Sequence, residues 1–431
     1  MSKKQVLALW IIAIALVIAV VVVKSTKSES FTTATERSRG DTLLADFKPD
    51  EVAAITITKG QETLNLKKTE GTWTVTERDN YPALVRSINE LLRTLAEVKV
   101  TQGIEADPAS APRFGMDPES DNPEEQATDL VLADAGGKEI ARLTFGKNLE
   151  AASDPMSPFG GGSTGRFIRN HADTSGIYVT SELFPTLTAK AEAWLHDDFL
   201  KVEKIQSIAV SEPGKPDATA WKLTRPTADA EFTLEGKAAN EELNTENITP
   251  LKSLFSYARF EDVLTAEKAE SAWDKEKRQT AVITTEEGFT YNLSFGPMKE
   301  EAPPSADAPP AGSYLMTVTV TANIPAERKK EEGEKEEDAK TKDEAFATRK
   351  KALEERLAAD RKLEGRTFKV SKFTIEALLK SRPELIKAAQ PAADASTPAA
   401  DGAPGVPENL RRPVQAVTPP IEIPAAPEEG E

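Results

Sequence analysis

The segment DEVAAITITKGQETLNLKKTEGTWTVTE, residues 50–77, alternates apolar and polar residues along most of its length. A period of two is typical of strands that bury one face. Gly71 marks a turn between two alternating runs. The segment therefore predicts an antiparallel meander, with these apolar residues on its buried face: Val52, Ala54 or Ile55, Ile57, Leu64, Leu66, Trp73 and Val75.

The next segment, residues 81–100, has a different period. Its apolar residues recur at intervals of three and four, which predicts an amphipathic helix with Pro82 near the first turn. Residues 127–149 then predict a hairpin that turns at Gly136-Gly137. Two strand-like pieces follow, GRFIRN and SGIYVTSELFPTL, and the second runs into an apolar helical stretch that ends at Trp194-Leu195.

The second half of the chain repeats this order of elements. Trp221 in TAWKLTRP takes the place of Trp73, and residues 248–264 predict a second amphipathic helix. Phe295-Gly296 in the second hairpin matches Phe145-Gly146, and Phe368 corresponds to Tyr178. The apolar face of the second helix is formed by Leu251, Leu254, Phe255 and Phe260.

We therefore predict an α+β fold with two similar modules, residues 44–197 and 198–388. A sheet with one apolar face and a helix with one apolar face must bury those faces against each other. Each module is therefore expected to be a sheet-and-helix sandwich. Two unrelated α+β domains are the alternative interpretation.

The amino terminus predicts a transmembrane anchor within residues 1–24. Val6–Val23 is an uncharged run of 18 residues, and as a helix it would rise about 27 Å, close to the thickness of a bilayer core. We expect an uncleaved signal anchor in a bacterial inner membrane, with the rest of the chain outside the cytoplasm. A cleaved signal peptide is the alternative. Residues 25–43 are polar and are expected to be a tether.

Two insertions and a tail distinguish the second half. Residues 300–312 form a Pro-rich loop in the sequence, and residues 326–365 are densely charged with a helical composition. A solvated helical arm is favoured there over a partner-binding helix. Residues 389–431 are rich in Pro and Ala and are expected to be a disordered tail.

Composition excludes several kinds of chemistry. The 71 acidic residues outnumber the 54 basic ones, which argues against nucleic acid as a partner. There is no Cys, so disulfides, thiol catalysis and Cys-ligated metals are excluded. We predict no catalytic residue, no cofactor, no metal site and no small-molecule substrate.

Four motifs contain residue types that could form a site. His196, Asp197 and Asp198 include metal-ligand types, but adjacent side chains point in different directions, so a charged connector is favoured. The Gly-rich residues 159–166 lack the Lys of a phosphate loop and are expected to be a flexible loop. Residues 113–120 indicate a turn, and His171 lies in a loop without an evident partner.

The order of several motifs resembles the bacterial family catalogued as domain of unknown function forty-three forty. The resemblance covers residues 45–200 well and the second half only loosely. It is carried by Phe47 and Pro49, Trp73, residues 114–118 (FGMDP), residues 144–146 (TFG) and Tyr178. Members typically have an N-terminal transmembrane anchor and often occur beside gliding-motility-type ABC transporter auxiliary proteins. The resemblance thus implies an accessory role in the cell envelope and supplies no catalytic residues.

We predict a non-enzymatic, membrane-anchored scaffold that binds other envelope proteins, such as an ABC-type transporter complex. One alternative is a cell-wall hydrolase that uses two carboxylates. The other is a sensor that binds a metal or a small ligand through His196, Asp197 and Asp198.

Overall fold

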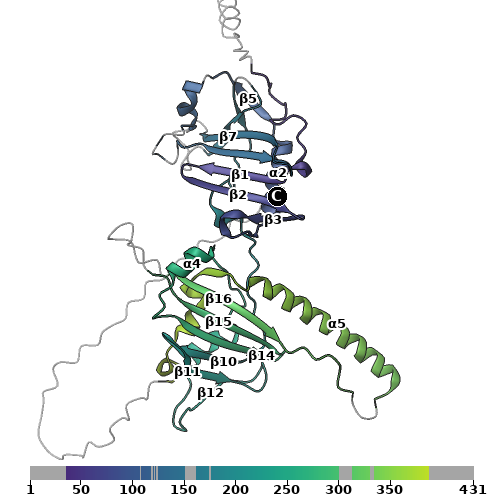
Figure 1. Ribbon diagram of the computed structural model, residues 1–431, viewed down its shortest axis with the longest axis vertical. Helices are drawn as coiled ribbons and strands as arrows, with labels where there is room; N and C mark the ends of the chain where they lie inside the picture. The colour runs from purple at the N-terminus through teal and green to yellow at the C-terminus, as the bar shows by residue number, and fades with distance from the viewer. Residues whose placement is uncertain are drawn as a thin grey trace, which may run out of the picture. The chain divides into compact units, whose positions relative to one another are not determined.

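The computed structural model describes most of residues 35–387 (Figure 1). The expected span at residues 6–23, the Pro-rich loop 300–312 and the tail 389–431 lie outside the described residues. Among the residues that are described, no helix has both the length and the apolarity needed to cross a membrane. The positions within 35–387 that are not described are 107, 118–119, 121, 123–124, 151–161, 174–175, 300–312 and 331–333.

Two antiparallel sheets and a few helices form the described part of the chain, which confirms the α+β class. The first sheet has nine strands in the order β4-β3-β2-β1-β6-β7-β8-β9-β5. These strands are β1 (Ala54–Lys59), β2 (Glu62–Thr69), β3 (Thr72–Val75), β4 (Tyr81–Pro82), β5 (Val100–Ile104), β6 (Thr128–Ala133), β7 (Glu139–Glu150), β8 (Ser163–Asn170) and β9 (Ile177–Thr180).

The second sheet has eight strands in the order β12-β11-β10-β14-β15-β16-β17-β13. Both sheets lie in one compact unit that ends at Lys387. The strands are β10 (Ile205–Glu212), β11 (Lys215–Thr224), β12 (Thr233–Leu234), β13 (Asp262–Leu264), β14 (Gln279–Thr285), β15 (Phe289–Pro297), β16 (Ser313–Ala322) and β17 (Thr367–Ser371). The helices are α2 (Val85–Glu97), α3 (Thr245–Lys252), α4 (Ala266–Ala272), α5 (Glu336–Asp360) and α6 (Lys372–Ile375).

The two sheets share a strand order, as an internal repeat would produce. The run β1-β6-β7-β8-β9-β5 corresponds to β10-β14-β15-β16-β17-β13. Phe145 and Phe295 occupy matching strands, β7 and β15, and both are fully buried. The predicted equivalence of Trp73 and Trp221 is wrong, because Trp73 lies on β3 whereas Trp221 lies on β11, the strand next to β10. Both indole rings are nevertheless core residues.

The first predicted helix is present as α2. Its apolar stripe, Ile88, Leu91, Leu92 and Leu95, is buried against the sheet core. The second predicted helix is shorter than expected: α3 begins after Asn244, whose side chain accepts from the N–H of Glu246, and ends at Lys252. Leu254 and Phe255 are buried in turns beyond the helix, and Asp262–Leu264 pairs with β17 instead. Strand pairing therefore replaced the end of the predicted helix.

Two other expectations for local structure are corrected. The apolar stretch before Leu195 forms turns with only one short 3-10 helix, Ala191–Trp194. In the Gly-rich segment 159–166, the residues from Ser163 onward already belong to β8. Short elements of this kind have too few residues for a period to be recognised in the sequence.

The expected tether, residues 25–43, is folded from residue 35 onward. Arg37 donates from Nε and Nη2 to the two carboxylate oxygens of Asp173 at 2.7 and 2.8 Å. The Tyr178 hydroxyl donates to the same carboxylate at 2.7 Å, and Thr42 bridges to Lys99 beside β5. The described part of the tether is thus attached to the edge of the first sheet.

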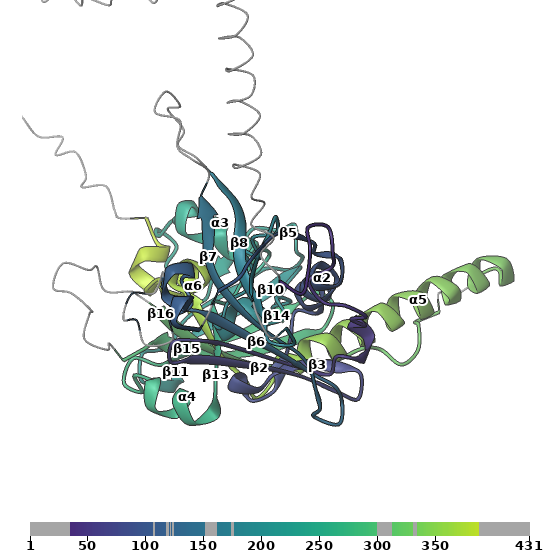
Figure 2. The ribbon, with the colours of Figure 1, turned by 90° about the horizontal axis from the view of Figure 1, so that it is seen from above.

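The charged insertion contains α5, which is exposed along most of its length (Figure 2). Asp360 is its only buried residue, while Leu353 and Leu357 pack partly against the core. Near the other end, Arg328 pairs with Glu334 and Asp343. The last turns of α5 are therefore held by the hydrophobic core. The first turns of α5 are held by ion pairs with the segment that precedes the helix.

Candidate functional site

The connector between the sheets passes beside the end of the first meander. Leu195 forms an isolated bridge with Ala83, and the N–H of His196 donates to the carbonyl of Pro82 at 2.9 Å. These backbone bonds place His196 next to β4. An aromatic cluster continues the core from there into the second sheet, and it consists of Tyr81, Phe199, Phe260 and Phe368 with ring centroids 5.0–6.2 Å apart.

The three adjacent residues His196, Asp197 and Asp198 come closer together than the sequence suggested. One ligand atom from each lies within 4.8 Å of the others, although both aspartates are exposed. The Asp198 N–H donates to Nδ1 of His196 at 3.3 Å, and Nε2 lies 3.8 Å from Oδ2 of Asp198. A neutral imidazole that accepts at Nδ1 carries its proton on Nε2. Exposed acidic groups commonly lie close together without holding an ion, so the trio by itself assigns no metal.

A pocket of about 710 Å³ opens beside this connector. Residues of the first sheet and the connector form one side, and the end of α5 with the turn after it forms the other. The lining residues are Thr72, Tyr81, Pro82, His196, Asp198, Phe199, Lys201, Glu203, Arg356, Ala359, Asp360, Lys362 and Leu363. The volume lies within the range of small-molecule sites, about 300–1,000 Å³.

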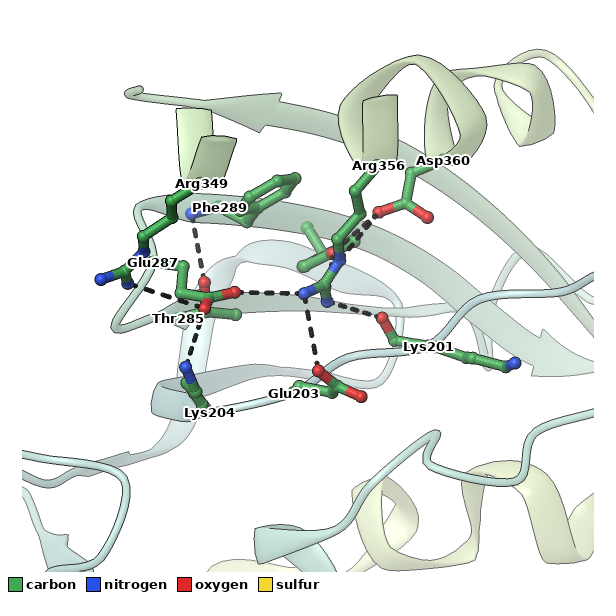
Figure 3. Close-up of polar contacts among 10 residues, drawn as sticks. Lys201, Glu203, Lys204, Thr285, Glu287, Phe289, Arg349, Arg356 and Asp360 are labelled. Atoms are coloured by element: carbon green, nitrogen blue, oxygen red, sulfur yellow. Dashed lines mark hydrogen bonds and ion pairs between the residues drawn. The ribbon is translucent and has the colours of Figure 1, made fainter. Parts of the chain in front are cut away.

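Arg356 connects α5 to the connector and to the second sheet (Figure 3). Its Nη1 donates to Glu287 at 3.2 Å, while Nη2 donates to the Lys201 carbonyl at 2.9 Å and to the Tyr291 hydroxyl at 3.2 Å. The Tyr291 hydroxyl donates in turn to Asp360 at 2.8 Å. Both Nη atoms of the guanidinium are therefore bonded to protein groups, and the side chain acts as part of the pocket wall.

Burial controls the ionisation of the groups around Arg356. It raises the pKa of Asp360 above the ordinary value, although the hydrogen bond from Tyr291 and the charge of Arg356 act in the opposite direction. Burial also raises the pKa of Tyr291. For Glu287 burial acts upward as well, but the hydrogen bond from Lys204 and the cation of Arg356 lower its pKa. Glu287 is thus the carboxylate that balances Arg356.

Tyr81 lines the pocket and has a perturbed hydroxyl. The side chain is 3% exposed, and burial raises the pKa of Tyr81 to about 12, with a smaller upward effect from Asp198 and a downward one from Arg366. No described residue makes a hydrogen bond with this hydroxyl. At neutral pH the group is consequently a neutral donor facing the pocket.

His171, expected to lack a partner, has one. Its Nε2 lies 2.8 Å from Oγ1 of Thr144, and that hydroxyl donates to Oδ1 of Asp129 at 2.5 Å. Thr144 therefore accepts from the Nε2–H of His171. Burial, followed by the charge of Arg169, lowers the pKa of His171. Only the cross-strand register, which places Asp129 opposite Thr144, reveals this chain of hydrogen bonds.

Arg166 is a half-buried charge that the sequence pattern does not reveal. It donates to the carbonyls of Gly146 and Leu183 at 3.0 Å and lies 5.2 Å from the centroid of the Phe145 ring. Burial lowers the pKa of Arg166 to about 10. Its partners are backbone carbonyls, which points to a structural role within β8. The turn predicted at residues 113–120 is consistent with the positive φ of Gly115.

Comparison with known proteins gives one match. Residues 73–276 match the family model described as Domain of unknown function (DUF4340). The match runs from Trp73 on β3 to a point beyond α4, so it reaches further into the second half than the motif resemblance implied. No curated protein and no solved structure matches the chain. The match over residues 73–276 supports the resemblance to the Domain of unknown function (DUF4340) family.

Proposed function

We propose that this protein is a membrane-anchored scaffold of the bacterial envelope that binds a subunit of an ABC-type transporter complex. The anchor is the apolar run Val6–Val23, and the two sheets form the part outside the cytoplasm. The protein contributes binding surfaces in this proposal and performs no chemistry. The observation that supports it best is the exposed length of α5.

α5 spans 25 residues, or about 37 Å of helix. Its contacts with the core come from the last turns, where Leu353, Leu357 and Asp360 lie. A helix that is polar on all sides is typical of segments that bridge through solvent to another body. The exposed turns from Glu336 to Thr348 are therefore the surface we assign to a partner protein.

Charged residues of both signs are interspersed along the arm. The first turn carries Glu336, Glu337 and Asp338, which also complement the helix dipole. Arg349, Lys350 and Lys351 form a basic group further along. Charged surfaces of this kind favour specificity and association rate more than affinity, which fits a partner held close by in the same membrane.

Site-specific photo-crosslinking in native membranes tests the proposal. A photoreactive residue at the exposed Glu344 of the full chain is expected to capture a transporter subunit, identified by mass spectrometry. The matched control is the exposed Asp217 on β11, which should capture none. Equal capture from both positions, or adducts only with other copies of this chain, would contradict the assignment.

The predicted topology has its own measurement. Protease added to spheroplasts is expected to degrade the sheets while leaving cytoplasmic marker proteins intact. Protection of the sheets would show that they lie inside the cytoplasm, and the envelope role would then be withdrawn.

A further inference from the structure

The pocket beside the connector contains an unsatisfied donor. The Tyr81 side chain is 3% exposed, and no described residue makes a hydrogen bond with its hydroxyl. Among the described residues, the fully enclosed side-chain atoms without a partner are Thr76 Oγ1 and Arg382 Nη1. The Tyr81 hydroxyl is not one of them, so it keeps contact with solvent on the pocket side. A phenol hydroxyl that reaches solvent and has no protein partner is free to donate to an acceptor on a ligand.

The wall of the pocket also holds uncommitted charges of both signs. Lys201 and Lys362 line it, and neither ammonium has an ion pair among the described residues. On the acidic side, Asp198 is 87% exposed, and its one ion-pair contact among the described residues is with the imidazole of His196 at 3.8 Å. Arg356 and Asp360, by contrast, already have hydrogen-bond partners. Arg356 donates to Glu287 and to the Tyr291 hydroxyl, and Asp360 accepts from that hydroxyl. The groups available to a ligand are therefore two cations, the exposed carboxylates of Asp198 and Glu203, and one phenol.

Apolar surface completes the site. Phe199 and Leu363 line the pocket and are almost fully buried, at 8% and 7% exposed. Small-molecule sites commonly combine such a floor with a few converging polar groups.

We infer that this pocket binds a small zwitterion with an apolar side group, in the size class of a dipeptide. Its carboxylate is received by Lys201, Lys362 and the Tyr81 hydroxyl. Its ammonium group is received by Asp198, and its side group lies on the apolar floor. The site is separate from the α5 surface proposed for a partner protein, so either assignment can fail without the other.

Isothermal titration calorimetry on the full chain in detergent tests the inference, with L-alanyl-L-phenylalanine as the probe. The N-acetylated dipeptide lacks the ammonium group, and the dipeptide amide lacks the carboxylate. We expect the unmodified dipeptide to bind and each analogue to bind roughly 10-fold or more weakly, because charge-assisted hydrogen bonds are lost. Equal binding of all three would overturn the assignment of a zwitterion.

Matched variants separate the site from non-specific binding. Tyr81→Phe removes only the hydroxyl and keeps the edge-on contacts with Phe260 and Phe368, so it is expected to fold. It and Lys362→Gln should each weaken dipeptide binding by roughly 10-fold or more. Lys268→Gln, at an exposed residue of α4 outside the pocket, should leave binding unchanged.

Thermal unfolding of each variant checks that the fold is retained. Failure of the dipeptide to bind at millimolar concentration overturns the inference, as does binding that Tyr81→Phe and Lys362→Gln leave unaltered in folded protein.

Discussion

Arg78, which follows β3, donates from Nε and Nη2 to the two carboxylate oxygens of Asp262 on β13 at 2.7 and 2.9 Å. The two residues are 184 positions apart in the sequence. Their bidentate pair joins the first sheet to the edge strand of the second. Bidentate pairs of this geometry are stronger and more directional than ordinary surface ion pairs.

Loss of Arg78 is expected to destabilise the protein. Arg78→Met should lower the free energy of unfolding by about 2 kcal/mol, because Asp262, 23% exposed, loses its counterion. Urea unfolding monitored by tryptophan fluorescence measures the loss. The control is Lys48→Met, which breaks an exposed pair with Glu51 and should leave the transition unchanged. Identical midpoints for both variants would contradict the importance of the Arg78 pair.

Asp360 is expected to make stability depend on pH. Its pKa is raised in the folded state, chiefly by burial, so the stability it contributes is present below the ordinary value of 3.8 and is lost as pH rises through the raised value. Asp360→Asn mimics the protonated acid. Relative to this variant, the wild type should therefore gain stability as pH falls from neutral toward about 4. If the difference in the free energy of unfolding between wild type and Asp360→Asn stayed constant across that pH range, the pKa of Asp360 would not be raised by folding.

The glycines of the two matching pairs, Phe145-Gly146 and Phe295-Gly296, offer a matched test of packing. A Cβ at Gly146 would overlap the carbonyl oxygen of Phe114, whereas at Gly296 it would lie 3.1 Å from Cα of Arg278. Gly146→Ala should thus cost about 1–3 kcal/mol as an overpacked site, and Gly296→Ala should cost less. Thermal unfolding of the two variants gives the comparison, and a larger loss at Gly296 would count against it.

Arg356 is expected to hold the end of α5 in place. Arg356→Met removes the bonds to Glu287, to Tyr291 and to the Lys201 carbonyl, so amide hydrogen exchange near the end of α5 should accelerate. Arg349→Met is the control, because Arg349 is 64% exposed and lies 3.7 Å from Glu287. Acceleration of the same size in both variants would mean that the Arg356 contacts do not secure the helix.

Periodicity predicted the elements whose pattern is long. The α2 stripe and the alternation around Ile55 and Ile57 are both buried as expected, because a single buried face imposes the matching period on the sequence. The edge strands β5 and β13 were not predicted. They have five and three residues, which is too short for a period, and their pairing with β9 and β17 depends on chain that lies far away in sequence.

The candidate site could not be predicted in the same way. Tyr81, Lys201 and Lys362 come from three separate parts of the sequence, and each alone has the appearance of an ordinary core or surface residue. Tertiary packing brings them to one pocket. His196 and Asp198 were noticed because they are adjacent in sequence, yet their relevance lies in the pocket that they share with Tyr81.

If the run Val6–Val23 spans a membrane as proposed, the attachment of Arg37 to Asp173 would set an upper limit on the distance between the folded residues and the bilayer. Thirteen residues, 24–36, separate the apolar run from Arg37. Such a stretch reaches at most about 45 Å when fully extended, compared with about 65 Å for a free tether over residues 25–43. With Val6–Val23 in the membrane, the edge of the first sheet around β5 is therefore confined to a shallow zone above the lipid. A protein that contacts this edge must itself expose its surface within that zone.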